Sequence, residues 1–335
     1  MNRRLSVAVV QGGPSTEAEV SRASAKGVAE ALKEAGHLVV RLELDAFLAE
    51  SLRSGGFDVV FPVAHGAVGE DGSLQGLLEV LDLPYVGSGV LASALAMDKR
   101  TARVLFERSA LPVAKGVAVR RADGHDAVAV ARSARAEVGA RVVVKPSSHG
   151  SAIGVARLEA EATDEEVARA LEAVWEIDEV AIVEHFARGR ELTCGVIEIA
   201  LDEPARPLPP TEIVSPQDGF YNYQAKYAPG RSRHVCPVDL PAHLVARVQE
   251  VAVRAHVALG CRDLSRVDIL AGDDEDAEKL TLLEVNTLPG MTTTSLFPEE
   301  AAVAGWPMAK WCDALVRKAH LRGPSKRLAA RPLPV

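Results

Sequence analysis

Apolar residues are arranged in two ways along the first part of the chain, and each arrangement predicts a different element. Apolar residues recur every three to four positions between short, continuous apolar runs, which predicts helices at Glu17–Ala35 and Val90–Ala96. The apolar runs themselves predict buried strands at Leu5–Val10, Leu38–Leu42 and Asp58–Val63. Repeated strand–helix units build a doubly wound parallel sheet, so we expect an α/β domain over residues 1–98.

The pattern changes in residues 99–188, where strands and helices no longer alternate regularly. Two strands, Arg141–Lys145 and Ile153–Leu158, flank a loop that contains glycine. Three helices are expected, one from Lys99 and the others at Asp126–Glu137 and Asp164–Trp175. Two further strands are expected at Val117–Val119 and Val180–Glu184. This mixture predicts a small central α+β domain.

Longer strands dominate residues 189–321, which we expect to form a third domain. The expected strands are Glu191–Ala200, Ser265–Leu270 and Leu280–Val285, and the expected helices are Ala242–Leu259 and Met308–His320. A loop rich in proline and glycine is expected from Pro216 to Pro237. The last stretch, residues 322–335, is basic and contains several prolines, so we expect a disordered tail.

Composition supports this picture and excludes some functions. The 335 residues are 48% hydrophobic and 25% charged, as in soluble globular proteins, and the length suggests about two or three domains. The formal net charge of −8 argues against a nucleic-acid-binding protein. No apolar stretch approaches the roughly 18 residues of a membrane helix, so we expect no membrane partner. The four cysteines lack CxxC spacing, which is typical of reduced thiols in a cytosolic protein.

The most specific chemical feature is a predicted hairpin formed by SRVDIL and LTLLEVN. Side chains alternate along a strand, so Arg266 and Asp268 share one face, as do Glu284 and Asn286. If these faces coincide, carboxylates and an amide oxygen lie together between apolar neighbours. A solvated sheet face is the alternative, but such hard oxygen ligands are typical of Mg²⁺ or Mn²⁺ bound with phosphate. Arg266 beside them suits an anionic transition state.

Two lysines are candidates for binding an anion such as phosphate. Lys145 precedes the small polar loop Ser147–Gly154, whose backbone N–H groups could cradle phosphates, although a flexible hairpin loop has the same composition. Lys99 follows Asp98, a good N-cap, and so falls in the first turn of a helix. A cation in the first turn interacts unfavourably with the helix dipole, and a bound anion would offset this cost. An ordinary surface turn is the alternative.

Three further segments carry candidate binding residues. Thr16 and Glu19 fit a capping box, which leaves Glu17 either as a favourable charge at the start of the helix or as a ligand for an amine. His65 follows an apolar run at the carboxyl edge of a strand, where open α/β sheets bind ligands, although it could also be a histidine with only structural partners. The segment GFYNYQAKYAPG places three tyrosines and Lys226 in one loop, which we interpret as a lid rather than as simple packing.

Taken together, these segments resemble the D-alanine–D-alanine ligases of the ATP-grasp superfamily. The resemblance runs in order from about Val7 to about His320, and its most specific stretches are HGAVGEDGSLQG, YVGSGVLASALAMDK, FYNYQAKY and LLEVNTLPGMTTTSL. It implies a three-domain ATP-grasp fold with ATP between the central and C-terminal domains. It also implies a cytoplasmic homodimer that makes D-alanyl-D-alanine for peptidoglycan through a D-alanyl phosphate.

The resemblance also implies a role for each matching residue. ATP would be bound by Lys99, Lys145, Gly150, Glu184, His185, Ala187 and Glu191. Two Mg²⁺ or Mn²⁺ ions would be held by Asp268, Glu284 and Asn286. The first D-alanine would be bound by Glu17, Ser151, Tyr227 and His65. The oxyanion hole would be formed by Arg266 and Gly290, and the second D-alanine or the transferred phosphate would be engaged by Lys226, Ser295 and Leu296.

Some positions depart from what is common in the family, and two alternatives stay open. The departures are Ala18, Ser148, His149, Ala152, His185 and Phe186.

Lys226 and Tyr227 argue for an amine acceptor, but D-serine, D-lactate or a role in a specialised pathway would use the same chemistry. A regulatory nucleotide-binding module without catalysis is disfavoured by Arg266. A nicotinamide-dependent dehydrogenase fails because Gly12-Gly13-Pro14 is not GxGxxG.

Overall fold

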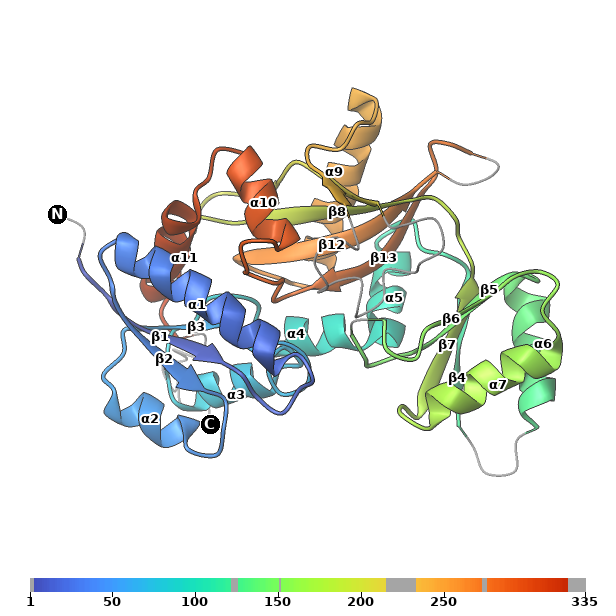
Figure 1. Ribbon diagram of the computed structural model, residues 1–335, viewed down its shortest axis with the longest axis horizontal. Coiled ribbons are helices and arrows are strands. Elements are labelled where there is room, and N and C mark those ends of the chain that lie inside the picture. The colour runs from blue at the N-terminus through green and yellow to red at the C-terminus, as the bar shows by residue number, and fades with distance from the viewer. Residues whose placement is uncertain (1–2, 122–125, 151, 215–232, 273–275, 325–335) are drawn as a thin grey trace, which may run out of the picture.

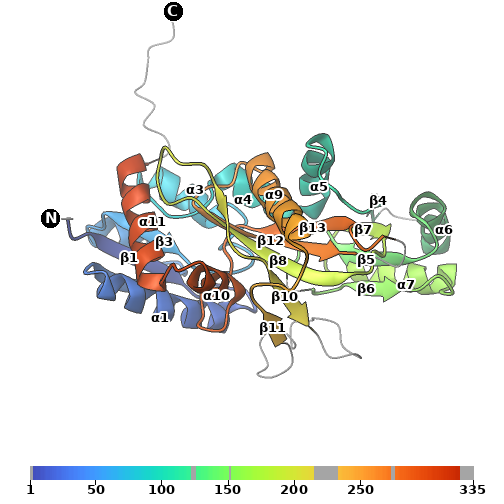
Figure 2. The same ribbon diagram turned by 90° about the horizontal axis from the view of Figure 1, so that it is seen from above.

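Three sheets form the framework of the protein, and the largest lies between the other two (Figures 1 and 2). This computed structural model describes residues 3–121, 126–150, 152–214, 233–272 and 276–324. In those ranges, no helix combines the length and apolarity needed to cross a membrane. All four cysteines are free thiols.

The N-terminal sheet is parallel and has the strand order β2-β1-β3, as the alternating pattern predicts. Its strands are β1 (Ser6–Gln11), β2 (Leu38–Glu43) and β3 (Val59–Pro62). The helices in this part of the chain are α1 (Ala18–Glu34), α2 (Leu48–Ser54) and α3 (Ser73–Val80). Helices α2 and α3 were not predicted.

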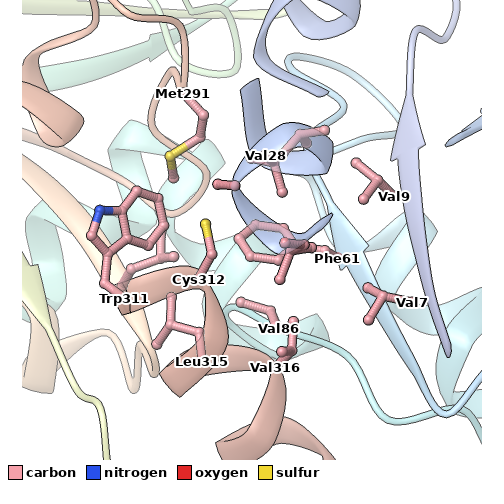
Figure 3. Packing of buried hydrophobic residues seen from close by; sticks show 14 of the residues in the cluster. Val7, Val9, Val28, Phe61, Val86, Met291, Trp311, Cys312, Leu315 and Val316 are labelled. Carbon is pink, nitrogen blue, oxygen red and sulfur yellow. The ribbon is translucent and has the colours of Figure 1, made fainter. Parts of the chain in front are cut away.

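Alternate residues of β1 pack into different hydrophobic clusters, as the two-residue period of a strand requires. Ala8 and Val10 pack in a cluster with α2 and α3. Val7 and Val9 pack with α1 and with α11 (Met308–Arg322), the last helix of the chain (Figure 3). The C-terminal helix therefore completes the core of the N-terminal sheet. It includes Arg322, so the expected tail begins later than predicted.

The smallest sheet is antiparallel, with the order β4-β7-β5-β6, and α6 and α7 pack against it. Its strands are β4 (Gly116–Arg120), β5 (Val142–Pro146), β6 (Ala156–Leu158) and β7 (Val180–His185). The helices are α6 (Ala127–Val138) and α7 (Asp164–Trp175). The strand expected from Ile153 begins only at Ala156, because Ala152 and Gly154 have positive φ angles that form a turn.

The central sheet has the order β11-β10-β8-β12-β13, and β9 also pairs with β8. Its strands are β8 (Arg190–Ile197), β9 (Arg206–Pro207), β10 (Thr211–Val214), β11 (Arg233–Val235), β12 (Leu264–Ala271) and β13 (Leu280–Asn286). The helices around it are α4 (Val90–Met97), α5 (Lys99–Arg108), α9 (Ala242–Ala258) and α10 (Leu296–Val303). Strands β9 and β10 and helix α10 were not predicted, and β11 lies inside the expected Pro216–Pro237 loop. The rest of that loop lies largely outside the described residues.

One face of the central sheet is apolar and the other carries polar side chains. Leu192, Cys194, Val267 and Ile269 point into a cluster formed with α4, α5 and α9. The alternate positions of β8 and β12 face the other way, and they carry the polar residues of the candidate site. The division of the chain at residues 98, 188 and 321 remains a prediction.

Candidate active site

The predicted hairpin exists, and its register brings the four polar residues onto one face. Arg266 pairs with Asn286 and Asp268 pairs with Glu284 across β12 and β13. Arg266 donates from Nε and Nη2 to the two carboxylate oxygens of Asp268, at 2.9 and 2.8 Å. Asp268 also accepts from Thr193 Oγ1 at 2.8 Å and from Asn286 Nδ2 at 3.1 Å. The arginine and the carboxylate therefore orient each other.

The oxygen atoms of this face suit a divalent cation that also binds phosphate. Asp268 and Glu284 supply carboxylates, and Asn286 supplies an amide oxygen while its nitrogen donates to Asp268. No group of three or more His, Cys, Asp or Glu side chains within the described ranges could hold a metal without other ligands. Mg²⁺ commonly takes only one or two protein carboxylates and completes its shell with phosphate oxygens and water, so the residues present fit Mg²⁺ or Mn²⁺.

A cleft between the small and central sheets holds most of the predicted ATP-binding residues. Six of the seven predicted ATP-binding residues line it, namely Lys99, Lys145, Glu184, His185, Ala187 and Glu191, and so does the predicted metal ligand Asp268. Glu284 also lines this cleft, which joins it to the hairpin face. The space in the cleft is about 940 Å³ when the open solvent at its mouth is counted.

The two lysines in the cleft point at carboxylates on different sheets. Lys99 Nζ donates to the carbonyl of His149 at 2.7 Å and lies 3.3 Å from Glu284 Oε2. Lys145 Nζ lies 2.5 Å from Glu184 Oε1. The N-cap role predicted for Asp98 is confirmed, since its Oδ1 accepts from the backbone of Thr101 at 2.9 Å. Both ammonium groups thus line the cleft, and each is paired with a carboxylate, Glu284 for Lys99 and Glu184 for Lys145.

The other end of the cleft is more apolar and includes residues that the sequence did not single out. Val143, Leu270 and Leu283 line it, and the guanidinium of Arg157 lies 5.4 Å from the ring centroid of Phe186. Burial lowers the pKa of Arg157, and the nearby charge of Glu191 partly offsets this. A cation over an aromatic ring has no short sequence signature, because the two residues lie far apart along the chain.

His65 and the loop after β13 meet at the edge of the N-terminal sheet. His65 Nδ1 donates to the carbonyl of Leu288 at 3.1 Å, and its Nε2 lies 3.3 Å from Ser24 Oγ. The Met291 N–H donates to the same hydroxyl at 3.1 Å. Burial lowers the pKa of His65, and the charge of Glu17 partly offsets the effect. His65 thus lies beside the segment that contains Gly290.

Glu17 occupies a position different from the one implied by the predicted capping box. It is itself the N-cap residue of α1, and its side chain makes no capping hydrogen bond. Glu19 instead forms an ion pair with Arg22 on the next turn. The capping-box prediction for Thr16 and Glu19 is therefore wrong. The carboxylate of Glu17 acts electrostatically on His65 and on Glu70, which places it in the same group of residues.

Glu70 belongs to this group, although the sequence analysis did not single it out. Its Oε1 accepts from the backbone of Gly66 at 2.9 Å. Burial and the neighbouring carboxylate of Glu17 raise the pKa of Glu70 to about 8, although Arg266 lowers it. Its position in HGAVGEDG, five residues after His65, is the only sequence signal that could have found it.

Gly290 and the N-terminal end of α10 lie side by side. Ser295 Oγ accepts from the backbone of Thr292 at 3.0 Å, and Leu296 is the buried first residue of α10. A Cβ atom on Gly290 would approach Ser295 Oγ to 2.8 Å, so the glycine permits this close contact. Gly150 adjoins the cleft through the loop whose His149 carbonyl binds Lys99. Ser151, Lys226 and Tyr227 lie outside the described residues, so the lid and its contacts remain predictions.

Comparison with known proteins identifies the family of this chain. A family model described as D-ala D-ala ligase C-terminus matches residues 105–317, and one described as D-ala D-ala ligase N-terminus matches residues 48–88. The chain belongs to the D-alanine–D-alanine ligase family. The expected α/β fold with a parallel N-terminal sheet is confirmed, and it is the ATP-grasp fold of this family.

Individual family members agree with this chain over nearly its full length. The D-alanine–D-alanine ligase of Gluconobacter oxydans is 42% identical over 95% of this chain and 100% of its own. That of Halalkalibacterium halodurans is 42% identical over 90% and 94%. The Coxiella burnetii ligase structure is 28% identical, with a TM-score of 0.78 over 96% of this chain and 95% of its own. The Bacillus anthracis ligase complexed with ATP has the same identity and TM-score over 96% and 98%.

Proposed function

We propose that this protein joins two D-alanines to D-alanyl-D-alanine and converts ATP to ADP and phosphate. The observation that carries the proposal is the hairpin face of Arg266, Asp268, Glu284 and Asn286, which adjoins a cleft with two lysines in a chain of this family. The product would serve peptidoglycan precursor synthesis in the cytoplasm, and the protein would act as a homodimer. Family membership supports these assignments.

The first chemical step activates a carboxylate, which is a poor acyl donor. A carboxylate oxygen of the first D-alanine attacks the γ-phosphorus of ATP, the bond to the β-phosphate oxygen breaks, and ADP leaves. Lys99 and Lys145 stabilise the charge on the phosphate oxygens. Two Mg²⁺ or Mn²⁺ ions, held by Asp268, Glu284 and Asn286, would supply further charge neutralisation on the transferring group. The product is a D-alanyl phosphate.

The second step forms the peptide bond. The amine of the second D-alanine attacks the acyl carbon, and negative charge develops on the former carbonyl oxygen. Arg266, whose plane is fixed by two hydrogen bonds to Asp268, and the N–H of Gly290 stabilise this oxyanion. The intermediate collapses when the bond to the phosphate oxygen breaks, and the amine loses its proton.

The two amino acids would bind on either side of the reacting carbon. Glu17 binds the ammonium of the first D-alanine, and His65 lies by its carboxylate. Ser295 and Leu296 bind the carboxylate of the second. We assign Lys226 and Tyr227 to a lid that excludes water, because an acyl phosphate hydrolyses readily, and Ser151 to the hydrogen-bonded set around the first D-alanine.

A panel of acceptors tests this proposal directly. Purified protein with ATP, Mg²⁺ and D-alanine is supplied with D-serine or D-lactate as a second acceptor, and phosphate release is measured at neutral pH. We expect D-alanine alone to give the highest rate. A faster reaction with D-alanine plus D-lactate would show that the acceptor assignment is wrong while preserving the activation step.

A further inference from the structure

A buried carboxyl group on α10 lies on the same face of the central sheet as Arg266 and Asp268 and has no part in the mechanism above. Glu300 of α10 has no solvent exposure. Its Oε2 accepts a hydrogen bond of 2.5 Å from the backbone N–H of Gly195 in β8. Its Oε1 has no hydrogen-bond partner among the described residues, and the same is true of the buried Oγ1 of Thr211. Burying a carboxyl group with one oxygen left without a partner costs free energy, so the group calls for an explanation.

Glu300 connects the strand pair that holds Arg266 to helix α10, which begins at Leu296. Gly195, which it contacts, is the cross-strand partner of Arg266. At the other end, Glu300 lies four residues after Leu296 in α10, so both side chains point from the same face of the helix. Leu296 packs against Ile213 of β10 in the same sheet. Helix α10 is thus attached to the central sheet close to Arg266.

The local packing is built around this carboxyl group. A Cβ atom on Gly195 would approach Glu300 Oε2 to 2.7 Å and would also come within 2.9 Å of Leu208 and Phe297. Glycine at this strand position leaves the space that the carboxyl group occupies. Strands usually disfavour glycine, except where another group approaches closely, as here.

The surroundings of Glu300 disfavour its charged form. Burial raises the pKa of Glu300 well above its ordinary value, and the Gly195 hydrogen bond and the charge of Arg266 offset this only in part. Asp268 of β12 adds to the increase. The thiols of Cys194 and Cys236 are the other titratable groups that interact with Glu300, and their pKa values are also raised by burial. The hydrogen bond to Gly195 needs only an oxygen acceptor at this position.

We propose that Glu300 is a positioning residue that keeps Ser295 and Leu296, the acceptor end of the site, in register with Arg266. This inference rests on the proposed function. Attack by the amine requires the acceptor to be placed accurately against the acyl carbon, and a displacement of about 1 Å can lower a rate by about 10²-fold. Loss of the Gly195–Glu300 hydrogen bond would loosen α10 but leave the ATP cleft unchanged.

Two variants of similar size separate positioning from packing. Glu300→Gln keeps a neutral oxygen acceptor for the Gly195 N–H, whereas Glu300→Leu fills the space without one. Initial rates over a range of D-alanine concentrations give KM for the first and second D-alanine, and a separate series gives KM for ATP. We expect E300Q to stay within threefold of the wild type. We expect E300L to raise KM of the second D-alanine at least tenfold and KM of ATP less than twofold.

Each possible outcome decides the proposal. An unchanged KM of the second D-alanine in E300L, or equal increases for ATP and both D-alanines, would overturn it and leave Glu300 a packing residue. If the wild type makes no dipeptide, the proposed function fails instead. If E300L does not fold, Glu300→Met, which is unbranched and also lacks an oxygen acceptor for the Gly195 N–H, takes its place with the same expected result. An unchanged KM of the second D-alanine in that variant would overturn the proposal.

Discussion

Arg266 shows how one residue acquires its role from its neighbours. Its guanidinium makes two hydrogen bonds to Asp268, which itself accepts from Thr193 and Asn286. A planar group held in this way can present further N–H donors in a fixed direction, which a lysine cannot do. A regulatory nucleotide binder would have no need for such an arrangement.

Substitution of Arg266 separates catalysis from nucleotide binding. We expect R266A to lower kcat for dipeptide formation by at least about 10²-fold, because an oxyanion donor is lost. The Kd of ATP, measured by calorimetry, should change by less than about threefold. R266K keeps the charge but not the paired hydrogen bonds, and should also be impaired. Wild-type activity in R266A would refute the oxyanion role.

The raised pKa of Glu70 predicts a pH dependence of stability. The folded state holds a proton up to about pH 8, whereas the unfolded chain releases it near the ordinary glutamate value. The folded state therefore binds more protons in this interval, and stability falls as the pH rises. Urea unfolding at pH 5.5 and 8 should show a smaller loss for E70Q than for the wild type. Parallel losses would contradict the assignment.

At the residue scale, strand periodicity was enough to predict the hairpin face. Arg266, Asp268, Glu284 and Asn286 depend only on alternation and on one antiparallel register. Glu70 and Glu300 could not be assigned in this way, because their chemistry comes from burial and from neighbours that the sequence does not place beside them.

At the scale of elements, helix ends position the cleft residues more than helix interiors do. Asp98 caps α5 through Thr101 and also accepts from Ser147 Oγ at 3.1 Å, so it joins the start of α5 to the end of β5. Lys99 in the first turn is held where it contacts His149 and Glu284. This cap was predictable from local sequence. The start of α1 was not, because Glu19 pairs with Arg22 rather than capping the helix.

Removal of the α5 cap should affect both stability and ATP binding. We expect D98A to destabilise the protein by about 1 kcal/mol, because the Thr101 N–H loses its acceptor. KM of ATP should rise severalfold, since Lys99 is then less well oriented. D98N keeps an oxygen acceptor and is the matched control. Unfolding by urea and a KM series give both values; a D98A variant equal to D98N would contradict this role.

At the scale of the whole molecule, the last helix connects the N-terminal and central sheets. Asp263 is fully buried, and Arg322 donates to its two oxygens at 2.7 and 2.8 Å. Lys318 of the same helix bonds Glu198 at 2.8 Å. Burial alone raises the pKa of Glu198, but hydrogen bonds from His256 and Lys318 outweigh it and lower the pKa to about 2. Sequence motifs alone could not predict these ion pairs, because their partners lie far apart along the chain.

This ion network predicts a difference between two arginines of α11. R322A removes two hydrogen bonds to the buried Asp263, which keeps its ion pair with Lys318 at 3.1 Å, and should destabilise the protein by about 1.5–3 kcal/mol. R317A removes a surface pair with Asp313 one turn away and should cost about 1 kcal/mol or less. Urea unfolding of both variants measures the difference. Equal losses would show that the network does not stabilise this junction.

The net charge of −8 describes the whole chain and not the cleft. Lys99 and Lys145 line the cleft, and Arg266 adjoins it, so an acidic protein presents basic groups to anionic substrates. Asp268 and Glu284 place part of the acidic charge where it can hold cations. The distribution of charge, rather than its sum, determines what the site can bind.

The most direct test of the central claim is mass spectrometry of the products formed from ATP, Mg²⁺ and D-alanine labelled with ¹⁸O in its carboxylate. Ligation through a D-alanyl phosphate predicts D-alanyl-D-alanine and ADP in equal amounts, with one ¹⁸O atom in each phosphate released. Absence of the dipeptide, or a dipeptide accompanied by unlabelled phosphate, would contradict this mechanism.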